Sequence, residues 1–196
     1  KALATTSAGV AWSHGYPDGD RLPLSLLRVT VANITRVVRV PVSVDVEGGF
    51  SDDPAAVGET VAAVIEAGAV GINIEDGAGA PDLLCAKIEQ AKGAGARLGV
   101  DLFVNARTDV YLRGLASKES RVEETLARAK RYRAAGADGI FVPGLADAAE
   151  IRAVAQASPM PLNLMAWSGL APAAELEALG VRRLSAGAGI AEVVYA

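Results

Sequence analysis

The sequence predicts a (β/α)₈ barrel, because short apolar segments alternate with longer amphipathic segments along its 196 residues. The short segments are rich in β-branched residues, and the long ones are rich in Ala, Glu and Arg with apolar residues at helical spacing. Strands that alternate with helices in this way form parallel sheets. The sequence Ala-Gly-Ala occurs at 67–69 and again at 135–137. These two copies lead from a helical segment into a strand segment, as C-cap glycines do.

Seven strands are predicted in order along the chain. They cover Ala2–Ser7, Val40–Val46, Val70–Glu75, Leu102–Arg107, Gly139–Val142, Pro161–Ala166 and Arg183–Ala186. The predicted helices include Pro54–Ala67, Pro81–Ala94, Lys118–Ala135, Ala146–Ala157 and Pro172–Leu179. The pair Asp53-Pro54 is typical of a helix start, with Asp as the N-cap and Pro at the first helical position.

A closed barrel needs eight strands and about 250 residues. We therefore expect the first strand and the closing C-terminal helices to be missing from this chain. Because no linker divides the sequence, residues 1–196 are predicted to form a single, incomplete barrel domain. An open, doubly wound sheet, which needs fewer strands, is the alternative.

Composition argues against several classes of protein. The net charge is −4 and no long basic run is present, so we expect no nucleic-acid partner. The apolar runs are too short to cross a bilayer, and no signal peptide is recognisable. Cys85 is the only cysteine, which rules out an internal disulfide and favours the cytoplasm. Since His14 is the only histidine, a bound metal would need oxygen ligands, as Mg²⁺ or Mn²⁺ does.

Carboxylates lie at the ends of two neighbouring predicted strands. Asp45 and Glu47 are two residues apart and share a strand face, and Glu75 ends the next strand. The carboxyl ends of barrel strands form the catalytic mouth, so these three acids are predicted to meet there and to hold Mg²⁺. Asp76 should point to the opposite face. Alternatively, the acids are solvated or cap the following helices.

The next strand carries Asn105, Arg107 and Asp109 on one face. An arginine at a barrel mouth needs an anionic partner, and a substrate carboxylate or phosphate suits its two-pronged geometry. Asn105 and Arg107 are therefore predicted to bind substrate. A structural ion pair of Arg107 with Glu75 or Asp109 is the alternative, and the two interpretations are compatible.

Two loops complete the predicted site. Small and hydroxyl residues at Thr6, Ser7 and Ala8, followed by a glycine, suit an anion held by backbone N–H groups. Asp18 or Asp20, in the turn-rich segment 15–20, could reach the metal. Ordinary turns are the alternative for both loops, and for Asp18 and Asp20 taken singly a turn-forming role is the stronger interpretation.

In these segments the chain resembles the isocitrate lyase / phosphoenolpyruvate mutase superfamily. The motifs that carry the resemblance are Thr6-Ser7-Ala8-Gly9, Tyr16-Pro17-Asp18-Gly19, Val44-Asp45-Val46-Glu47-Gly48-Gly49-Phe50, Ile74-Glu75-Asp76 and Ala106-Arg107-Thr108-Asp109. Their order and spacing agree over nearly the whole chain. Glu47 replaces the second Asp of the family pattern.

The resemblance implies a (β/α)₈ barrel, homo-oligomers such as dimers or tetramers, and chemistry through an enolate-like pyruvate fragment. It implies that Asp45 ligates Mg²⁺ with support from Asp18, Glu47 and Glu75, and that Arg107 contacts substrate. It also implies that Thr6, Ser7 and Ala8 cradle a substrate carboxylate.

The sequence departs from the family at the usual acid or base. The Lys-Lys/Arg-Cys-Gly-His loop of isocitrate lyases is replaced by a short loop at 77–84, and Cys85 falls in a helical run as a buried small hydrophobe. The lysine-bearing gate loop of phosphoenolpyruvate mutases is not recognisable, and the lyases' Glu after the sixth strand aligns with Pro143. Arg107 and Glu75 are thus the predicted catalytic residues, with Tyr16 or a metal-bound water handling protons.

The function predicted from these residues is a Mg²⁺-dependent carbon–carbon lyase or decarboxylase acting on a small 2-oxo acid or related carboxylate. Decarboxylation suits the residues present, because it needs an electron sink and no proton donor in the bond-breaking step. A phosphonomutase acting on a C–P bond and a non-catalytic barrel that binds an oxo-acid are the alternatives.

Overall fold

The computed structural model describes residues 2–195 and contains seven parallel strands in one sheet, in the order β1 to β7. The strands are β1 (Leu3–Ala4), β2 (Val42–Asp45), β3 (Gly71–Glu75), β4 (Phe103–Arg107), β5 (Gly139–Phe141), β6 (Leu162–Met165) and β7 (Val181–Ser185). The helices are α1 (Ser7–Ser13), α2 (Leu24–Val37), α3 (Pro54–Glu66), α4 (Pro81–Arg97), α5 (Arg121–Ala134), α6 (Ala148–Ala157), α7 (Ala173–Ala178) and α8 (Gly189–Tyr195).

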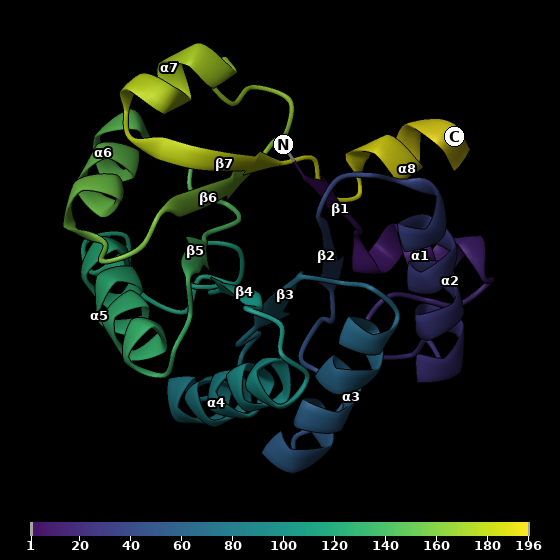
Figure 1. Cartoon of the computed structure of the whole chain (residues 1–196). Helices are drawn as coiled ribbons and strands as arrows, with labels where there is room; N and C mark the ends of the chain where they lie inside the picture. The colour runs from purple at the N-terminus through teal and green to yellow at the C-terminus, as the bar shows by residue number, and fades with distance from the viewer. Residues whose placement is uncertain (1, 196) are drawn as a thin grey trace.

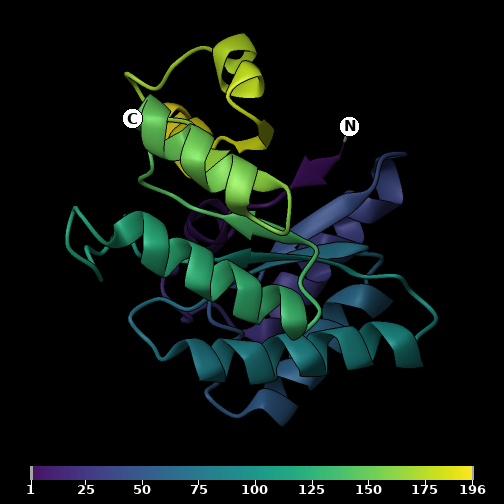
Figure 2. The ribbon, with the colours of Figure 1, turned by 90° about the vertical axis from the view of Figure 1, so that its left-hand side faces the viewer.

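The sheet curls into an incomplete barrel with the helices on its outer side (Figure 1). This confirms the predicted fold class and excludes an open sheet covered by helices on both faces. The side view shows α4 and α5 lying along the outside of the sheet (Figure 2). Within residues 2–195, β1 and β7 are the edge strands, and no helix is both long and apolar enough to cross a membrane.

All seven predicted strands and all five predicted helices are present, with shifted ends. The largest change at the N-terminus is that Ser7 begins α1 instead of ending a strand. Helices α1, α2 and α8 were not among the predicted elements. The start of α3 is as predicted, since the Asp53 side chain accepts a hydrogen bond from the N–H of Ala55 at 3.0 Å and Pro54 is the first helical residue.

The hydrophobic core lies between the outer face of the sheet and the helices. Ile72 and Ile74 on β3 are fully buried in one cluster with Leu84 and Ile88 of α4. Burying a side chain of this size stabilises the fold by about 1.5–3 kcal/mol. Because strand residues alternate between faces, packing these isoleucines outward turns Asn73 and Glu75 toward the barrel interior.

The strand register defines one layer of inward-facing side chains near the carboxyl ends of the strands. Glu75 pairs with Arg107, Arg107 with Phe141, Phe141 with Asn163, and Asn163 with Arg183. One rung below, Asp45 on β2 pairs with Asn73 and Asn73 pairs with Asn105. The residues expected to carry chemistry therefore occupy adjacent layers of the barrel interior.

Candidate active site

Asp45 ends β2 at the barrel mouth, and the chain around it holds its carboxylate in place. Oδ1 of Asp45 accepts a hydrogen bond from the N–H of Glu47 at 3.1 Å, and the N–H of Asp45 donates to Oγ1 of Thr5 at 2.9 Å. Burial raises the pKa of Asp45, although the amide of Glu47, the Arg107 guanidinium and the amide of Ser7 each lower it.

Glu47 is buried, and its backbone is in the left-handed region with φ of 52°. Its Oε2 accepts a hydrogen bond from the N–H of Asp20. Burial raises the pKa of Glu47 to about 7; that amide lowers it, and the carboxylates of Asp20, Asp18 and Asp45 raise it. A non-glycine residue held at positive φ stores strain, and such strain concentrates at functional sites.

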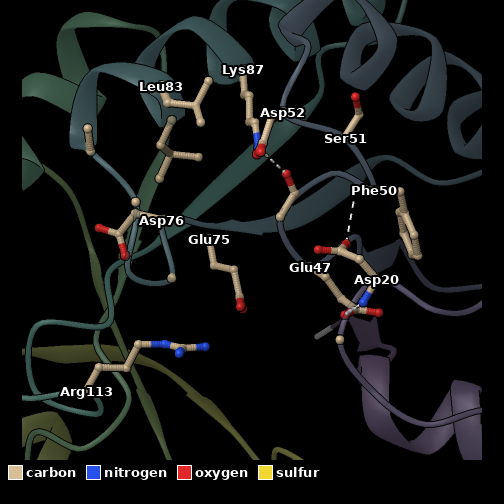
Figure 3. A pocket seen from close by; sticks show the side chains of 16 residues that line it. Asp20, Glu47, Phe50, Ser51, Asp52, Glu75, Asp76, Leu83, Lys87 and Arg113 are labelled. Carbon is tan, nitrogen blue, oxygen red and sulfur yellow. Dashed lines mark hydrogen bonds and ion pairs between the residues drawn. The ribbon is translucent and has the colours of Figure 1, made fainter.

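Asp20 connects the two loops of the mouth. Besides the contact to Glu47, Oδ1 of Asp20 accepts a hydrogen bond from the N–H of Phe50 at 3.1 Å (Figure 3). Burial raises the pKa of Asp20. Asp18, the metal ligand implied by the resemblance, is exposed, but its charge contributes to raising the pKa of Asp45 and of Glu47.

Arg107 is held between two carboxylates. Its Nη1 lies 2.7 Å from Oε2 of Glu75, and its Nε and Nη2 donate to the two oxygens of Asp109 at 2.7 and 3.1 Å. Asp109 is fully buried and also accepts from Nε of Arg113 at 2.9 Å. The structural ion pairs considered for Arg107 are thus present. They fix the guanidinium at the mouth, and its contact with a substrate anion stays a prediction.

Glu75 has three carboxylates near it in addition to its partner Arg107. Burial raises the pKa of Glu75 to about 7; Arg107 lowers it, and the carboxylates of Asp109, Asp45 and Glu47 raise it. In Figure 3 Glu75 lies between the Asp76 and Glu47 sides of the cavity, with Arg113 nearby.

Asp76 points away from the mouth, as the alternation predicts. Its Oδ2 accepts hydrogen bonds from Oη of Tyr132 at 2.6 Å and from Nη1 of Arg128 at 2.8 Å, and its Oδ1 accepts from the N–H of Asp109 at 2.9 Å. This carboxylate therefore ties the end of β3 to α5 and to the segment after β4.

The predicted substrate-binding residues lie at different depths. Thr6 is the N-cap of α1 without a side-chain capping bond, and Ser7 and Ala8 form the first turn of that helix. Asn105 is fully buried one layer below Arg107, where its Nδ2 donates to Oδ1 of Asn73 at 2.9 Å and its own Oδ1 has no partner among the described residues. Tyr16 is partly buried against the core. Their roles in binding and catalysis stay predictions.

The carboxylates do not form a ready-made metal cage. Within residues 2–195, no three side chains of His, Cys, Asp or Glu are gathered closely enough to hold a metal ion. The donor set nevertheless fits Mg²⁺ or Mn²⁺ in kind, because it consists of oxygens. Burial is the main cause of the raised pKa values of Asp45, Glu47 and Glu75, neighbouring carboxylates add to it, and a cation would offset both effects. Binding would require these carboxylates to converge.

A cavity of about 440 Å³ opens beside the mouth, lined by Asp20, Glu47, Glu75, Lys87 and Arg113 among others. Lys87, which the sequence analysis missed, is only 5% exposed, and its Nζ donates to the carbonyl oxygen of Gly48 at 2.8 Å. The ammonium therefore supports the loop that carries Glu47. The available signal was a lysine on the apolar face of α4 that also includes Leu84 and Ile88.

Cys85 and His14 lie outside this cluster. Cys85 is partly buried in α4 and packs against the core, and burial raises the pKa of its thiol. His14 shares a hydrogen bond of 2.7 Å with Oγ1 of Thr30 on α2. Within residues 2–195, neither side chain lines the cavity.

The sequence pattern that defines the phosphoenolpyruvate phosphomutase family matches residues 1–196, which is the whole chain. This chain belongs to that family. A family member from Burkholderia cenocepacia J2315, provisionally assigned as a phosphonomutase, has a solved structure that superposes with a TM-score of 0.93. The two are 43% identical, over 99% of this chain and 81% of that one. The structure of 2,3-dimethylmalate lyase gives a TM-score of 0.84 at 29% identity, over 99% and 69% of the two chains.

Curated relatives agree with this assignment. An uncharacterized protein of Mycobacterium tuberculosis is 40% identical over 191 residues, which cover 95% of this chain and 69% of that protein. An oxaloacetate decarboxylase of Ectopseudomonas mendocina is 32% identical over 182 residues, which cover 86% of this chain and 59% of the enzyme. The predicted superfamily is confirmed, and the relatives with an assigned activity include a 2-methylisocitrate lyase of Aeropyrum pernix, the oxaloacetate decarboxylase and the 2,3-dimethylmalate lyase.

Proposed function

We propose that this chain forms the substrate-binding and metal-binding part of a Mg²⁺-dependent enzyme that acts on a small 2-oxo acid or related carboxylate. In a 2-oxo acid it breaks a carbon–carbon bond at the carbon next to the carbonyl. Mn²⁺ would serve in the same place. The observation that carries the proposal is Arg107, fixed by Asp109 and Glu75 beside the surplus carboxylates of Asp45 and Glu47. An arginine next to a group of acids suits a substrate with two polar groups. Its carboxylate would bind the guanidinium, and its carbonyl oxygen would face the cation that the acids hold.

Each residue of the mouth has a distinct part in this proposal. Asp45, with Glu47, Glu75 and Asp18, would hold the ion, which when bound supplies positive charge that stabilises an enolate. Arg107 binds the substrate carboxylate and is kept from rotating by its two contacts to Asp109. Lys87 supports the loop of Glu47 through the carbonyl of Gly48.

A lyase or decarboxylase fits the available acid and base groups better than a cysteine-dependent mechanism. Cys85 is partly buried in α4 and packs against the core, and His14 is hydrogen-bonded to Thr30, so neither is placed to move a proton at the mouth. Loss of carbon dioxide from an oxo-acid such as oxaloacetate requires no proton donor in the bond-breaking step. Glu75 and Tyr16 are the proposed groups for any later proton transfer.

A phosphonomutase is the second candidate, favoured by the 43% identity to the Burkholderia cenocepacia protein assigned provisionally to that activity. The purified protein with Mg²⁺ should be assayed against oxaloacetate, methylisocitrate, dimethylmalate and phosphonopyruvate. Turnover of one of the first three supports the proposal, and turnover of phosphonopyruvate alone supports the mutase. No turnover on the whole panel, with oxalate still bound, would instead favour a barrel that only binds oxo-acids.

A further inference from the structure

Arg183 on β7 is a second arginine in the layer of the barrel that contains Arg107. The register runs from Arg107 through Phe141 and Asn163 to Arg183. A bulge between β6 and β7 sets this orientation, since Leu162 pairs with Val181 while Asn163, the next residue, pairs with Arg183. Val181 packs in the outer core, and Arg183 faces the interior.

Nothing in the described chain neutralises this guanidinium at close range. Within residues 2–195, the side chain of Arg183 forms no hydrogen bond and no ion pair, although it is partly buried. Its register partner Asn163 is engaged elsewhere, because its Nδ2 lies 3.0 Å from Oγ of Ser185. Burial lowers the pKa of Arg183, and the carboxylate of Asp45 acts in the opposite direction.

The neighbouring arginine behaves differently. Arg182 is exposed, and its Nη1 donates to the carbonyl oxygens of Glu177 and Val181 at 3.3 and 3.2 Å. Arg107, in the same layer as Arg183, has two carboxylate partners. A guanidinium that is partly withdrawn from water without an anion costs free energy, so an inward-facing arginine without a partner points to an anion that arrives from outside.

We infer that Arg183 binds a second anionic group of the substrate, so that the substrate is a small dianion held between Arg107 and Arg183. This inference rests on the proposed function, whose candidate substrates all carry at least two acidic groups, and it assigns recognition of the second acidic group to Arg183. Three inter-strand steps of roughly 4.8 Å separate β4 from β7 along the sheet. The curvature of the sheet turns both side chains toward the same interior, where a short dianion spans the space between them.

Lactate and malate are suitable probes, because both are 2-hydroxy acids and malate adds a second carboxylate. Their affinities should be measured by calorimetry at saturating Mg²⁺ for the wild type, Arg183→Gln and the matched control Arg182→Gln. We expect the wild type and Arg182→Gln to prefer malate by at least about tenfold. We expect Arg183→Gln to lose roughly 10- to 100-fold of malate affinity with little change for lactate.

Several outcomes would overturn the inference. They are an unchanged malate preference in Arg183→Gln, an equal loss for both ligands, or a wild type that binds neither. Arg183→Lys, which keeps the charge, should retain part of the preference and covers the case in which Arg183→Gln folds poorly. Turnover by the wild type tests the proposed function separately. An Arg183-dependent malate preference without turnover would support the inference and contradict the proposed function.

Discussion

At the scale of single residues, the acids of the mouth lie in surroundings that disfavour their ionised forms. Glu47 illustrates this, because it is 6% exposed, lies at positive φ and has three other carboxylates close enough to raise its pKa. Such a residue costs stability when no cation is present, which is the usual relation between a binding site and the fold that carries it.

Replacing Glu47 with Gln should stabilise the metal-free protein at pH 8 and have little effect at pH 5. The pKa of Glu47 in the folded protein, about 7, lies above its usual value, so protonated Glu47 favours the folded state. This stabilisation is complete below about pH 4.5 and is lost as the pH rises through 7. The gain at pH 8 should be on the order of 1–3 kcal/mol. Urea unfolding in EDTA at both pH values measures it. Glu59→Gln, an exposed acid on α3, is the control, and an equal effect of Glu47→Gln at both pH values would contradict this account.

Replacing Cys85 with Ser should change kcat/KM only by a small factor. The thiol is partly buried in α4 and packs against the core, whereas loss of a true catalytic acid costs roughly 10²–10⁴-fold. Arg107→Lys serves as the positive control, because one ammonium cannot reproduce the bidentate contacts to Asp109 and a large loss is expected. A collapse of activity in Cys85→Ser would revive a cysteine-dependent lyase mechanism.

At the scale of elements, buried polar contacts fix the strand ends that form the mouth. Asp76 joins β3 to α5 through Tyr132 and Arg128 and reaches the segment after β4 through the N–H of Asp109. Since Glu75 precedes Asp76, this anchor on the outer side also determines where Glu75 lies on the inner side.

Replacing Asp76 with Ala should lower the free energy of unfolding by about 3–5 kcal/mol, because it leaves a buried guanidinium and a hydroxyl without their acceptor. Urea denaturation measures the loss. Asp82→Ala, an exposed acid that pairs with Arg131, removes the same charge and should cost less than about 1 kcal/mol. A similar small loss for Asp76→Ala would show that the anchor is not important for stability.

The helices and strands differ in how well the sequence predicts them. The strands were predicted because their outward residues, such as Ile72 and Ile74, are β-branched and bounded by glycines. Helix α2 was missed because Val29, Thr30, Val31, Ile34 and Thr35 give it the composition of a strand. Only the spacing of its buried residues, Leu27 and Val31, indicates a helix.

At the scale of the whole molecule, the barrel brings together residues that are far apart in sequence. Local spacing was enough to place Asp45 and Glu75 on the inner face of the sheet, because each is the last inward-facing residue of its strand. It could not place Arg183, since the bulge between β6 and β7 shifts the alternation by one residue. Nor could it identify the contact of Lys87 with Gly48, which joins α4 to a loop 39 positions earlier. Oligomeric assembly stays a prediction.

The central claim is that the strand ends form a site for a divalent cation and a small oxo-acid around Asp45. The most direct test is calorimetric titration of oxalate with and without Mg²⁺, comparing the wild type, Asp45→Ala and Asp101→Ala, whose side chain is fully exposed. We predict Mg²⁺-dependent oxalate binding in the wild type and in Asp101→Ala and its loss in Asp45→Ala. Unchanged Mg²⁺-dependent affinity in Asp45→Ala would contradict the account and place the site elsewhere.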